Sequence, residues 1–420
     1  MNRTTLMPRR RTLTASAALC TALLTGCAAT DADTSDTSVA AATESTTTDA
    51  GPTSVRSATP RLAVTYDGGL LVLDAETLSV VGESELDGFN RIAPAGDERH
   101  VAVATAGGFR MLDTGTWSQA HGDHAHHYTA APALTDLVFD AEEPGHVVRH
   151  AGRTVLFDDG TGRVVSFDPA ELADGSPATS VFTTPAAHHG VAMELSDGRL
   201  VTTLGDGKAR TGIVVYDANR TEIARSEECP GVHGETVAAD ESVVFGCENG
   251  LLIYRDGVIT KVTSPDPYGR IGNQAGSEDS PVVLGDYKTD RDAELERPQR
   301  VSLTNTETGE LRLVDLGTSY TFRSLGRGPF GEALVLGTDG ALHVLDPSSG
   351  EVLRRLPVVD PWTEPAQWQT PRPALFVQGF TAYVTDPATN RIHAVDVETG
   401  EVTASVELPH TPDEITGVRG

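Results

Sequence analysis

The chain has 420 residues, and its 60 acidic against 32 basic side chains give a formal net charge of −28 at neutral pH. This balance excludes a nucleic-acid binder, because phosphate recognition needs a basic face. With 39% hydrophobic residues, 42 Gly and 24 Pro, the composition favours a turn-rich globular protein. Its acidic surface attracts cations.

The first 60 residues predict export followed by a tether. Residues 1–26 combine an Arg-rich start with an apolar stretch too short to span a membrane, which is typical of a signal peptide. The sequence then resembles a bacterial lipobox, which predicts lipid attachment at Cys27; ordinary cleavage of a secreted protein is the alternative. Residues 27–60 are rich in Ala, Thr, Ser and Asp, which predicts a disordered tether. We therefore expect a cell-membrane lipoprotein on the extracytoplasmic face, periplasmic or cell-surface, that contacts the membrane only through its lipid.

Residues 61–420 carry a repeated strand pattern. A Gly or Asn turn, an alternating apolar strand that ends near an Asp, a second turn and another strand recur eight times, as in GALHVLDPSSGEVL at 340–353 and NRIHAVDVETGEVT at 390–403. At about 45 residues per copy, each unit has the length of a four-stranded propeller blade. The pattern predicts an all-β fold, an eight-bladed β-propeller; seven blades remain the alternative because residues 260–300 are weakly patterned.

The two ends of the repeat region predict how the ring closes. The last residues, HTPDEITGVRG, resemble an innermost strand with no blade after it, whereas the stretch that begins RLAVTYDGG lacks such a strand. We expect the N- and C-terminal strands to complete one shared blade, which removes open sheet edges.

Six of the 13 histidines fall within residues 121–150, and the densest run is HGDHAHHY at 121–128. Imidazole is a common ligand of zinc and copper, so this segment predicts a metal-binding loop. Its candidate ligands are His124, His126 and His127, with His121 and Asp123 as further candidates. A solvated polar loop is the alternative.

A second set of histidines precedes the innermost strands of three consecutive predicted blades. These strands run in parallel around a propeller axis, so we expect His146, His188 and His233 to converge at one mouth and share an ion. His189 and Glu235 are further candidate ligands. The alternative is that each histidine only caps its strand.

Two cysteines remain after the signal peptide and Cys27 are set aside. In an oxidising compartment Cys229 and Cys247 are expected to form a disulfide whose loop encloses His233. A metal site that uses both thiolates is the alternative. No nucleophile elbow, HExxH helix, phosphate loop or dinucleotide fingerprint is present in the sequence, which predicts that the protein is not an enzyme.

The stretches at 121–175, 187–200 and 229–250 resemble the zinc metallochaperones of the AztD type. This resemblance implies an extracytoplasmic β-propeller that carries Zn²⁺ and passes it to the substrate-binding protein of a zinc ABC importer. It also implies a buried site at His146, His188 and His233, with the 124–127 histidines on a mobile loop for capture or handover. Which of the adjacent His188 and His189 points inward stays open. Two other functions stay open: a tethered scaffold for protein interactions, and a metal-dependent propeller hydrolase or lactonase.

Overall fold

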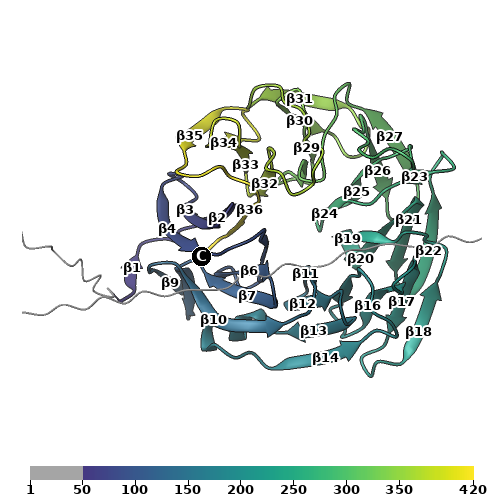
Figure 1. Ribbon diagram of the computed structural model, residues 1–420, viewed down its shortest axis with the longest axis horizontal. Coiled ribbons are helices and arrows are strands. Elements are labelled where there is room, and N and C mark those ends of the chain that lie inside the picture. The colour runs from purple at the N-terminus through teal and green to yellow at the C-terminus, as the bar shows by residue number, and fades with distance from the viewer. Residues whose placement is uncertain (1–50) are drawn as a thin grey trace, which may run out of the picture. The chain divides into compact units, whose positions relative to one another are not determined.

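Eight antiparallel sheets, each built on four strands, follow one another along residues 51–420, the part of the chain that the computed structural model describes. They are arranged as blades around a central axis (Figure 1). The predicted eight-bladed propeller is confirmed. The predicted signal peptide and the lipidation site Cys27 lie outside the described residues.

The first four blades contain the N-terminal half of the ring. Blade 1 comprises β36 (Ile415–Val418), β2 (Arg61–Tyr66), β3 (Gly69–Asp74) and β4 (Val80–Glu85). Blade 2 comprises β5 (Arg91–Pro94), β6 (His100–Thr105), β7 (Gly108–Asp113) and β10 (Ala133–Asp140). Blade 3 comprises β11 (Pro144–His150), β12 (Arg153–Asp158), β13 (Arg163–Phe167) and β14 (Thr179–Thr183), with the short 3-10 helix η1 (Pro169–Asp174). Blade 4 comprises β15 (Ala192–Glu194), β16 (Leu200–Gly205), β17 (Arg210–Tyr216) and β18 (Glu222–Ser226).

The other four blades complete the ring. Blade 5 comprises β19 (His233–Ala238), β20 (Ser242–Cys247), β21 (Asn249–Arg255) and β22 (Val258–Thr263), with η2 (Ala239–Glu241) and the short β23 (Gly269–Arg270). Blade 6 comprises β24 (Gln274–Ser277), β25 (Ser280–Asp286), β26 (Arg300–Asn305) and β27 (Leu311–Asp315). Blade 7 comprises β28 (Leu325–Arg327), β29 (Ala333–Leu336), β30 (Ala341–Leu345) and β31 (Val352–Pro357). Blade 8 comprises β32 (Leu375–Gln378), β33 (Thr381–Asp386), β34 (Arg391–Asp396) and β35 (Val402–Glu407).

Ring closure occurs in blade 1, as the sequence predicted. The C-terminal strand β36 is the innermost strand of this blade and pairs antiparallel with β2, with Arg61 opposite Val418. The blade therefore combines residues from both ends of the repeat region and leaves no open sheet edge between blades 8 and 1.

The hydrophobic core lies between neighbouring blades. Val201 and Ile213 of blade 4, for example, pack in one buried cluster with Val243 and Phe245 of blade 5. The middle strands β16 and β20 are buried along nearly their whole length, whereas the outermost strand β18 is mostly exposed. Face-to-face stacking of sheets thus fixes each blade against the next and positions the ends of the innermost strands.

A ninth, smaller sheet lies outside the blade pattern. The hairpin of β8 (Thr116–His121) and β9 (His124–Thr129) is inserted between β7 and β10 of blade 2, and β1 (Thr53–Val55) pairs with β9. Two sequence expectations differ from this result. The segment 121–127 is a strand pair instead of a loop, and within the described residues the first strand starts at Thr53, inside the stretch expected to be a disordered tether up to residue 60.

Within residues 51–420, none of the helices has the length and hydrophobicity that a membrane-spanning helix needs.

Candidate metal centre

Three histidines meet where the innermost strands of blades 3, 4 and 5 begin. One ring nitrogen from each of His146, His189 and His233 lies within 4.8 Å of the other two. The ring centroids are 5.3 Å apart for His146 and His189, 5.8 Å for His146 and His233, and 5.1 Å for His189 and His233. We call this set the mouth triad.

Local irregularities of the strands place these side chains. The register of β11 against β12 shifts between Pro144 and Val147, and that of β19 against β20 shifts between His233 and Glu235. Gly234, inside the second bulge, has a φ of +73°, and a Cβ there would lie 2.7 Å from the Gly272 carbonyl oxygen. Only glycine fits both constraints, and such bulges re-aim side chains beside functional sites.

Each imidazole of the mouth triad has its Nδ1 within hydrogen-bond distance of a protein oxygen. The pairs are His146 with Glu235 Oε2 at 3.1 Å, His189 with Asp159 Oδ2 at 2.5 Å, and His233 with the Gly272 carbonyl at 2.6 Å. Nε2 is therefore the nitrogen left on each ring to bind an ion. Oxygen acceptors behind metal-binding histidines fix the ring orientation and raise its basicity.

Two of these acceptors are themselves held in place. Asp159 also accepts the Gly190 backbone N–H at 3.1 Å, next to His189. The buried Asp286 accepts the backbone N–H of Gly272 at 2.6 Å and so fixes the peptide whose carbonyl faces His233. The triad is thus preorganised by the fold.

The pKa values of the two less exposed histidines shift in opposite directions. Burial alone would lower the pKa of His146, but the negative charge and hydrogen bond of Glu235 outweigh burial, and the pKa is raised above its usual value. Burial, reinforced by the nearby His146, lowers the pKa of His233 to about 3. His233 is therefore neutral at physiological pH and ready to bind a cation.

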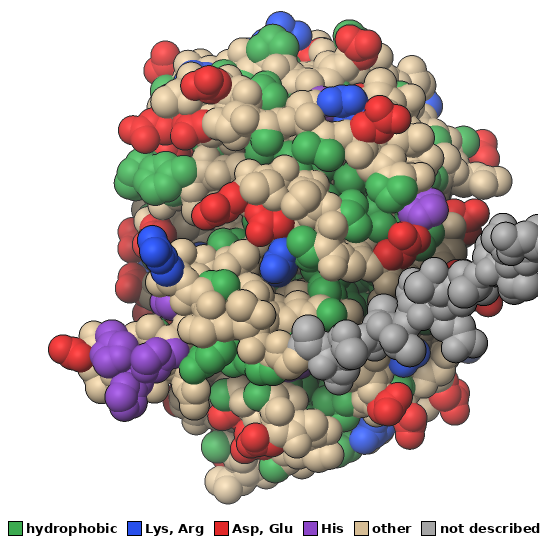
Figure 2. Space-filling model, turned by 90° about the vertical axis from the view of Figure 1, so that its left-hand side faces the viewer, with side chains coloured by type: hydrophobic (Ala, Val, Ile, Leu, Met, Phe, Trp, Pro, Cys, Tyr) green, Lys and Arg blue, Asp and Glu red, His purple; other side chains and the backbone are tan. Residues whose placement is uncertain are grey.

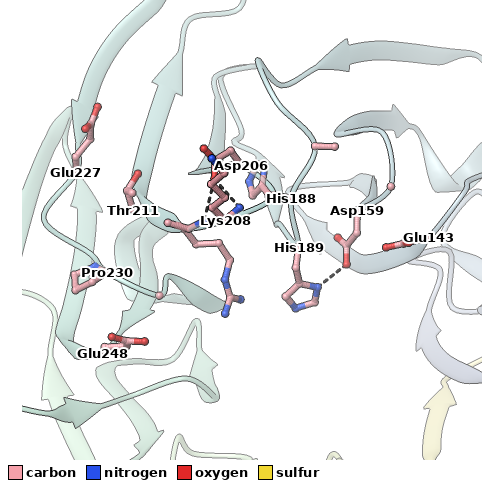
Figure 3. A pocket seen from close by; sticks show the side chains of 16 residues that line it. Glu143, Asp159, His188, His189, Asp206, Lys208, Thr211, Glu227, Pro230 and Glu248 are labelled. Carbon is pink, nitrogen blue, oxygen red and sulfur yellow. Dashed lines mark hydrogen bonds and ion pairs between the residues drawn. The ribbon is translucent and has the colours of Figure 1, made fainter. Parts of the chain in front are cut away.

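A cavity of about 830 Å³ opens beside His189. Figure 3 shows His189 pointing into this space with its hydrogen bond to Asp159, and carboxylates around the rim. The lining includes the acidic Glu143, Asp159, Asp206, Glu227 and Glu248, against the basic Lys208 and Arg210. The approach to the mouth triad is therefore predominantly acidic and favours a cation.

Of the adjacent His188 and His189, between which the sequence leaves the choice open, His188 does not join the triad. It is buried at 5% exposure, with Nδ1 2.9 Å from the Ala186 carbonyl and Nε2 2.9 Å from Thr203 Oγ1. Both ring nitrogens are occupied inside blade 4, so the neighbouring His189 takes the place predicted for His188. Glu235 lies behind His146 and is oriented by that hydrogen bond.

A second histidine cluster lies at the tip of the β8–β9 hairpin. One ring nitrogen from each of His121, His124 and His126 lies within 4.8 Å of the others, and all three residues are exposed. We call this set the hairpin triad. Gly122 forms the turn with a φ of +63°, and Asp123 lies 3.2 Å from His124 Nδ1. Side chains alternate along β9, so His127 faces away from the triad and bonds Ser118 Oγ at 2.7 Å.

The hairpin triad changes the predicted loop set in two ways. His121, at first only a further candidate, is part of the cluster, whereas His127, a main candidate, is not.

The predicted disulfide is confirmed. Cys229 and Cys247 are bonded, both side chains are buried, and their Cα atoms are 4.9 Å apart. The bridge joins the segment before His233 to the end of β20, and it excludes the alternative of a metal site built from the two thiolates.

Sequence reasoning missed the oxygen acceptors Asp159 and Gly272. Asp159 follows Asp158 in a tight turn between β12 and β13. Aspartate is common in turns, so its presence there does not indicate a partner for a metal-binding histidine. Gly272 acts through its backbone carbonyl, for which no side-chain pattern exists.

Together, the fold and the mouth triad define an eight-bladed β-propeller with a candidate metal centre at one end of its axis. No protein-family model matches the chain. The zinc chaperone AztD of Citrobacter koseri is 27% identical to it over 349 residues, which cover 79% of this chain and 80% of AztD. The resemblance inferred from the sequence is confirmed.

Solved structures share the fold. A crystal structure of Citrobacter koseri AztD has a TM-score of 0.75 at 24% identity, covering 86% of this chain and 98% of that chain. A structure of apo AztD from the same organism gives 0.74 at the same identity and coverage. The dihydro-heme d1 dehydrogenase NirN has a TM-score of 0.53 at 12% identity over 85% of this chain and 74% of its own, so the propeller architecture alone does not determine function.

Proposed function

We propose that this protein is an extracytoplasmic zinc metallochaperone, which holds Zn²⁺ at the mouth triad and delivers it to the substrate-binding protein of a zinc ABC transporter. The observation that carries the proposal is the convergence of three imidazoles from consecutive blades, each with its Nδ1 bonded to a protein oxygen. Its similarity to the zinc chaperone AztD supports zinc as the cargo.

The donor set suits a cargo ion. Three imidazole nitrogens supply three of the four ligands of a tetrahedral zinc ion. The fourth position stays open for water or for a ligand from an acceptor protein. Zinc has no geometric preference from its d electrons, so its ligands can be replaced one at a time.

The exposure of the three ligands suggests an order of release. The His189 side chain is 44% exposed and faces the cavity, whereas that of His146 is 19% exposed. We infer that an acceptor protein displaces His189 first and that His146 and His233 hold the ion until the acceptor has supplied new ligands.

The hydrolase alternative needs a general base beside the open coordination position. Glu235, the candidate base, is bonded to His146 Nδ1 and so lies behind a ligand, on the side away from Nε2. This placement supports an orienting role for Glu235. It favours a zinc-binding protein over the hydrolase alternative.

We further propose that the predicted lipid at Cys27 keeps the chaperone at the extracytoplasmic face of the membrane. A tether from residue 27 to β1 would confine the propeller near the importer and raise its effective concentration there.

The test is zinc binding and transfer with the chain from Ala28 onward. We expect one tightly bound zinc at the mouth, lost in His146→Ala/His233→Ala, and passage to the importer's binding protein without capture by a competing chelator. An intact mouth triad that binds zinc no better than the double variant contradicts the proposal. Complete loss of the zinc to the chelator during transfer contradicts direct delivery.

A further inference from the structure

A long connection lies over the end of the propeller on which the mouth triad opens. Residues 358–374 join β31, the outermost strand of blade 7, to β32, the innermost strand of blade 8. The mouth triad lies at the same end, where the innermost strands begin. The histidine-bearing hairpin, which Figure 2 shows projecting from one side of the molecule, leaves blade 2 after β7 and marks the other end. We call residues 358–374 the strap.

A buried ion pair holds the strap in one conformation. The Arg372 guanidinium lies 3.0 Å from Glu364 Oε1 and donates a second hydrogen bond, at 2.7 Å, to the Gln367 carbonyl. The Glu364 carbonyl accepts a hydrogen bond at 3.0 Å from Arg297, which belongs to the connection between β25 and β26 of blade 6. Prolines restrict the backbone of the strap further, namely Pro361, Pro365, Pro371 and Pro373. The strap therefore presents a fixed surface to a partner.

Trp368, in the middle of the strap, is a large apolar side chain that faces solvent. It is 52% exposed, and its ring contacts that of Phe89 edge-to-face, with the ring centroids 5.0 Å apart. Phe89 lies just before β5, the innermost strand of blade 2, so the strap reaches from blade 7 to blade 2 at the mouth end. Tryptophan is among the residues that most often dominate the binding energy of a protein interface.

A hollow opens beside the strap. It has a volume of about 420 Å³, and its walls include Trp362 together with Pro365 and Pro371, which flank Trp368 in the sequence. Pro387, in the turn between β33 and β34, also lines it. Because these walls are apolar, the hollow fits an apolar side chain of a partner. The strap thus combines an exposed aromatic ring with a neighbouring apolar hollow.

Few contacts separate the strap from the mouth triad. The Arg372 guanidinium lies 5.2 Å from the ring centroid of Phe322, whose carbonyl accepts a hydrogen bond from the Asn273 side chain at 2.8 Å. Asn273 follows Gly272, the residue whose carbonyl bonds His233. The strap and the mouth triad therefore adjoin each other at one end of the propeller.

A protein that takes zinc from the mouth triad must cover the strap as well. Its ligands have to come within about 2 Å of the ion. A specific interface buries about 800 Å² on each partner, which corresponds to a patch roughly 16 Å in radius. Centred on the triad, such a patch extends over the acidic cavity beside His189 on one side and over the strap on the other. The partner that fits is a protein with basic side chains opposite the acidic cavity and an apolar side chain opposite Trp368.

We propose that Trp368 and Phe89, together with the hollow beside the strap, form the docking surface for the protein that accepts the zinc. The inference rests on the proposed function, because it takes the acceptor to approach the mouth triad. It separates two roles on one face: the strap binds the acceptor protein, whereas the triad binds the ion. Trp368 is not one of the three ligands, so its loss should slow delivery without weakening zinc binding.

The test compares zinc delivery by the wild-type chain from Ala28 onward with delivery by Trp368→Ala and Trp368→Phe. Each is loaded with one equivalent of zinc and mixed with the importer's apo substrate-binding protein at concentrations below saturation, and the two proteins are separated at intervals for metal analysis. We expect Trp368→Ala to deliver zinc about 30-fold more slowly, as loss of an interface hot spot does, and Trp368→Phe to keep most of the rate. Zinc affinity, measured by chelator competition, should be equal in all three.

Phe330→Ala is the matched control. Phe330 is 68% exposed and contacts Phe380 edge-to-face, with the ring centroids 5.6 Å apart, so it also belongs to an exposed aromatic pair. It lies in the turn between β28 and β29, at the end where the innermost strands finish, and its replacement should leave delivery unchanged. Delivery by the wild-type chain should slow several-fold as salt rises from about 0.05 to about 0.5 M, because added ions screen the attraction between opposite charges.

Four results overturn the inference: delivery by Trp368→Ala at the wild-type rate, equal slowing by Phe330→Ala, delivery that does not slow with salt, or a wild-type dimer in size-exclusion chromatography that Trp368→Ala dissociates. In the last case a second copy covers the surface. A separate outcome concerns the proposed function itself. A wild-type chain that binds no zinc, or whose zinc never reaches the acceptor, contradicts the proposed function, whereas wild-type delivery that Trp368→Ala leaves unaltered overturns only the docking surface.

Discussion

The adjacent histidines of blade 4 provide the sharpest test of the mouth triad. His188 and His189 are neighbours in sequence, yet the structure gives them separate roles: His188 is buried with both ring nitrogens bonded, whereas His189 lines the cavity and is bonded through Nδ1 to Asp159. We expect His189→Ala to reduce zinc affinity with little effect on folding, and His188→Ala to reduce stability with little effect on zinc.

The expected magnitudes follow from the contacts. Structural zinc sites with four ligands bind the ion with a free energy of about 10–16 kcal/mol. Loss of one imidazole ligand therefore lowers the binding free energy by about 3 kcal/mol, or the affinity by ~100-fold. His188→Ala removes two buried hydrogen bonds of about 1 kcal/mol each and leaves a cavity, which together lower the free energy of unfolding by about 3 kcal/mol.

Zinc affinity is measured by competition with a zinc chelator, and the free energy of unfolding is measured by urea unfolding of the apo protein, on the same preparations. The reasoning is refuted if His188→Ala loses zinc affinity as strongly as His189→Ala, or if His189→Ala binds zinc as tightly as the wild-type chain. An urea midpoint unchanged by His188→Ala would contradict the structural role of that side chain.

Three further predictions concern the surroundings of the mouth triad. Glu235→Gln should weaken zinc binding by about 10–100-fold at about pH 7.5, as loss of an oxygen partner behind a ligand does, and isothermal competition titration checks this. In the wild-type chain zinc affinity should fall as pH drops from about 7.5 to about 5.5, because His146, with its raised pKa, takes up a proton first while His233, with a pKa near 3, stays neutral. Glu235→Gln should move this fall to lower pH, and a fall at unchanged pH argues against His146 as the competing site. Replacing Cys229 and Cys247 by Ser should lower the free energy of unfolding by about 3 kcal/mol, seen as a lower thermal midpoint; equal midpoints in the variant and the wild-type chain would show that the bridge does not constrain the unfolded chain.

The repeat architecture could be predicted from the sequence because each blade repeats the same turn and strand chemistry. Alternation along β30 and β34 and the Asp-containing turns after them mark blades 7 and 8 directly. Ring closure followed from the missing innermost strand at one end and the extra strand at the other. The disulfide followed from counting cysteines.

The site could be predicted only to the level of the blade. His146 and His233 begin innermost strands, so the repeat alignment located them, but His189 lies in an irregular segment where no alternation indicates which of two adjacent side chains faces the axis. The bulge at Gly234 and the carbonyl of Gly272 depend on tertiary packing, which a single sequence does not display.

The hairpin illustrates a different limit. The polar composition of residues 121–127 predicts a loop, yet the Gly122-Asp123 pair between two six-residue stretches is the pattern of a two-residue hairpin turn. Its strand character depends on the stacked Trp117 and Tyr128 and on the added strand β1, which comes from more than 60 residues earlier in the chain.

The placement of the mouth triad on three separate blades links the cargo to the integrity of the ring. A zinc ion held by His146, His189 and His233 is a further cross-link between blades 3, 4 and 5, added to their packed faces and to polar contacts such as that of His150 with Glu241. A protein that binds zinc only when folded gains about 2.7 kcal/mol when free zinc is 100 times the dissociation constant. The loaded chaperone should therefore outlast the empty one under proteolysis, so that the abundance of the protein itself reports how much zinc the cell has available.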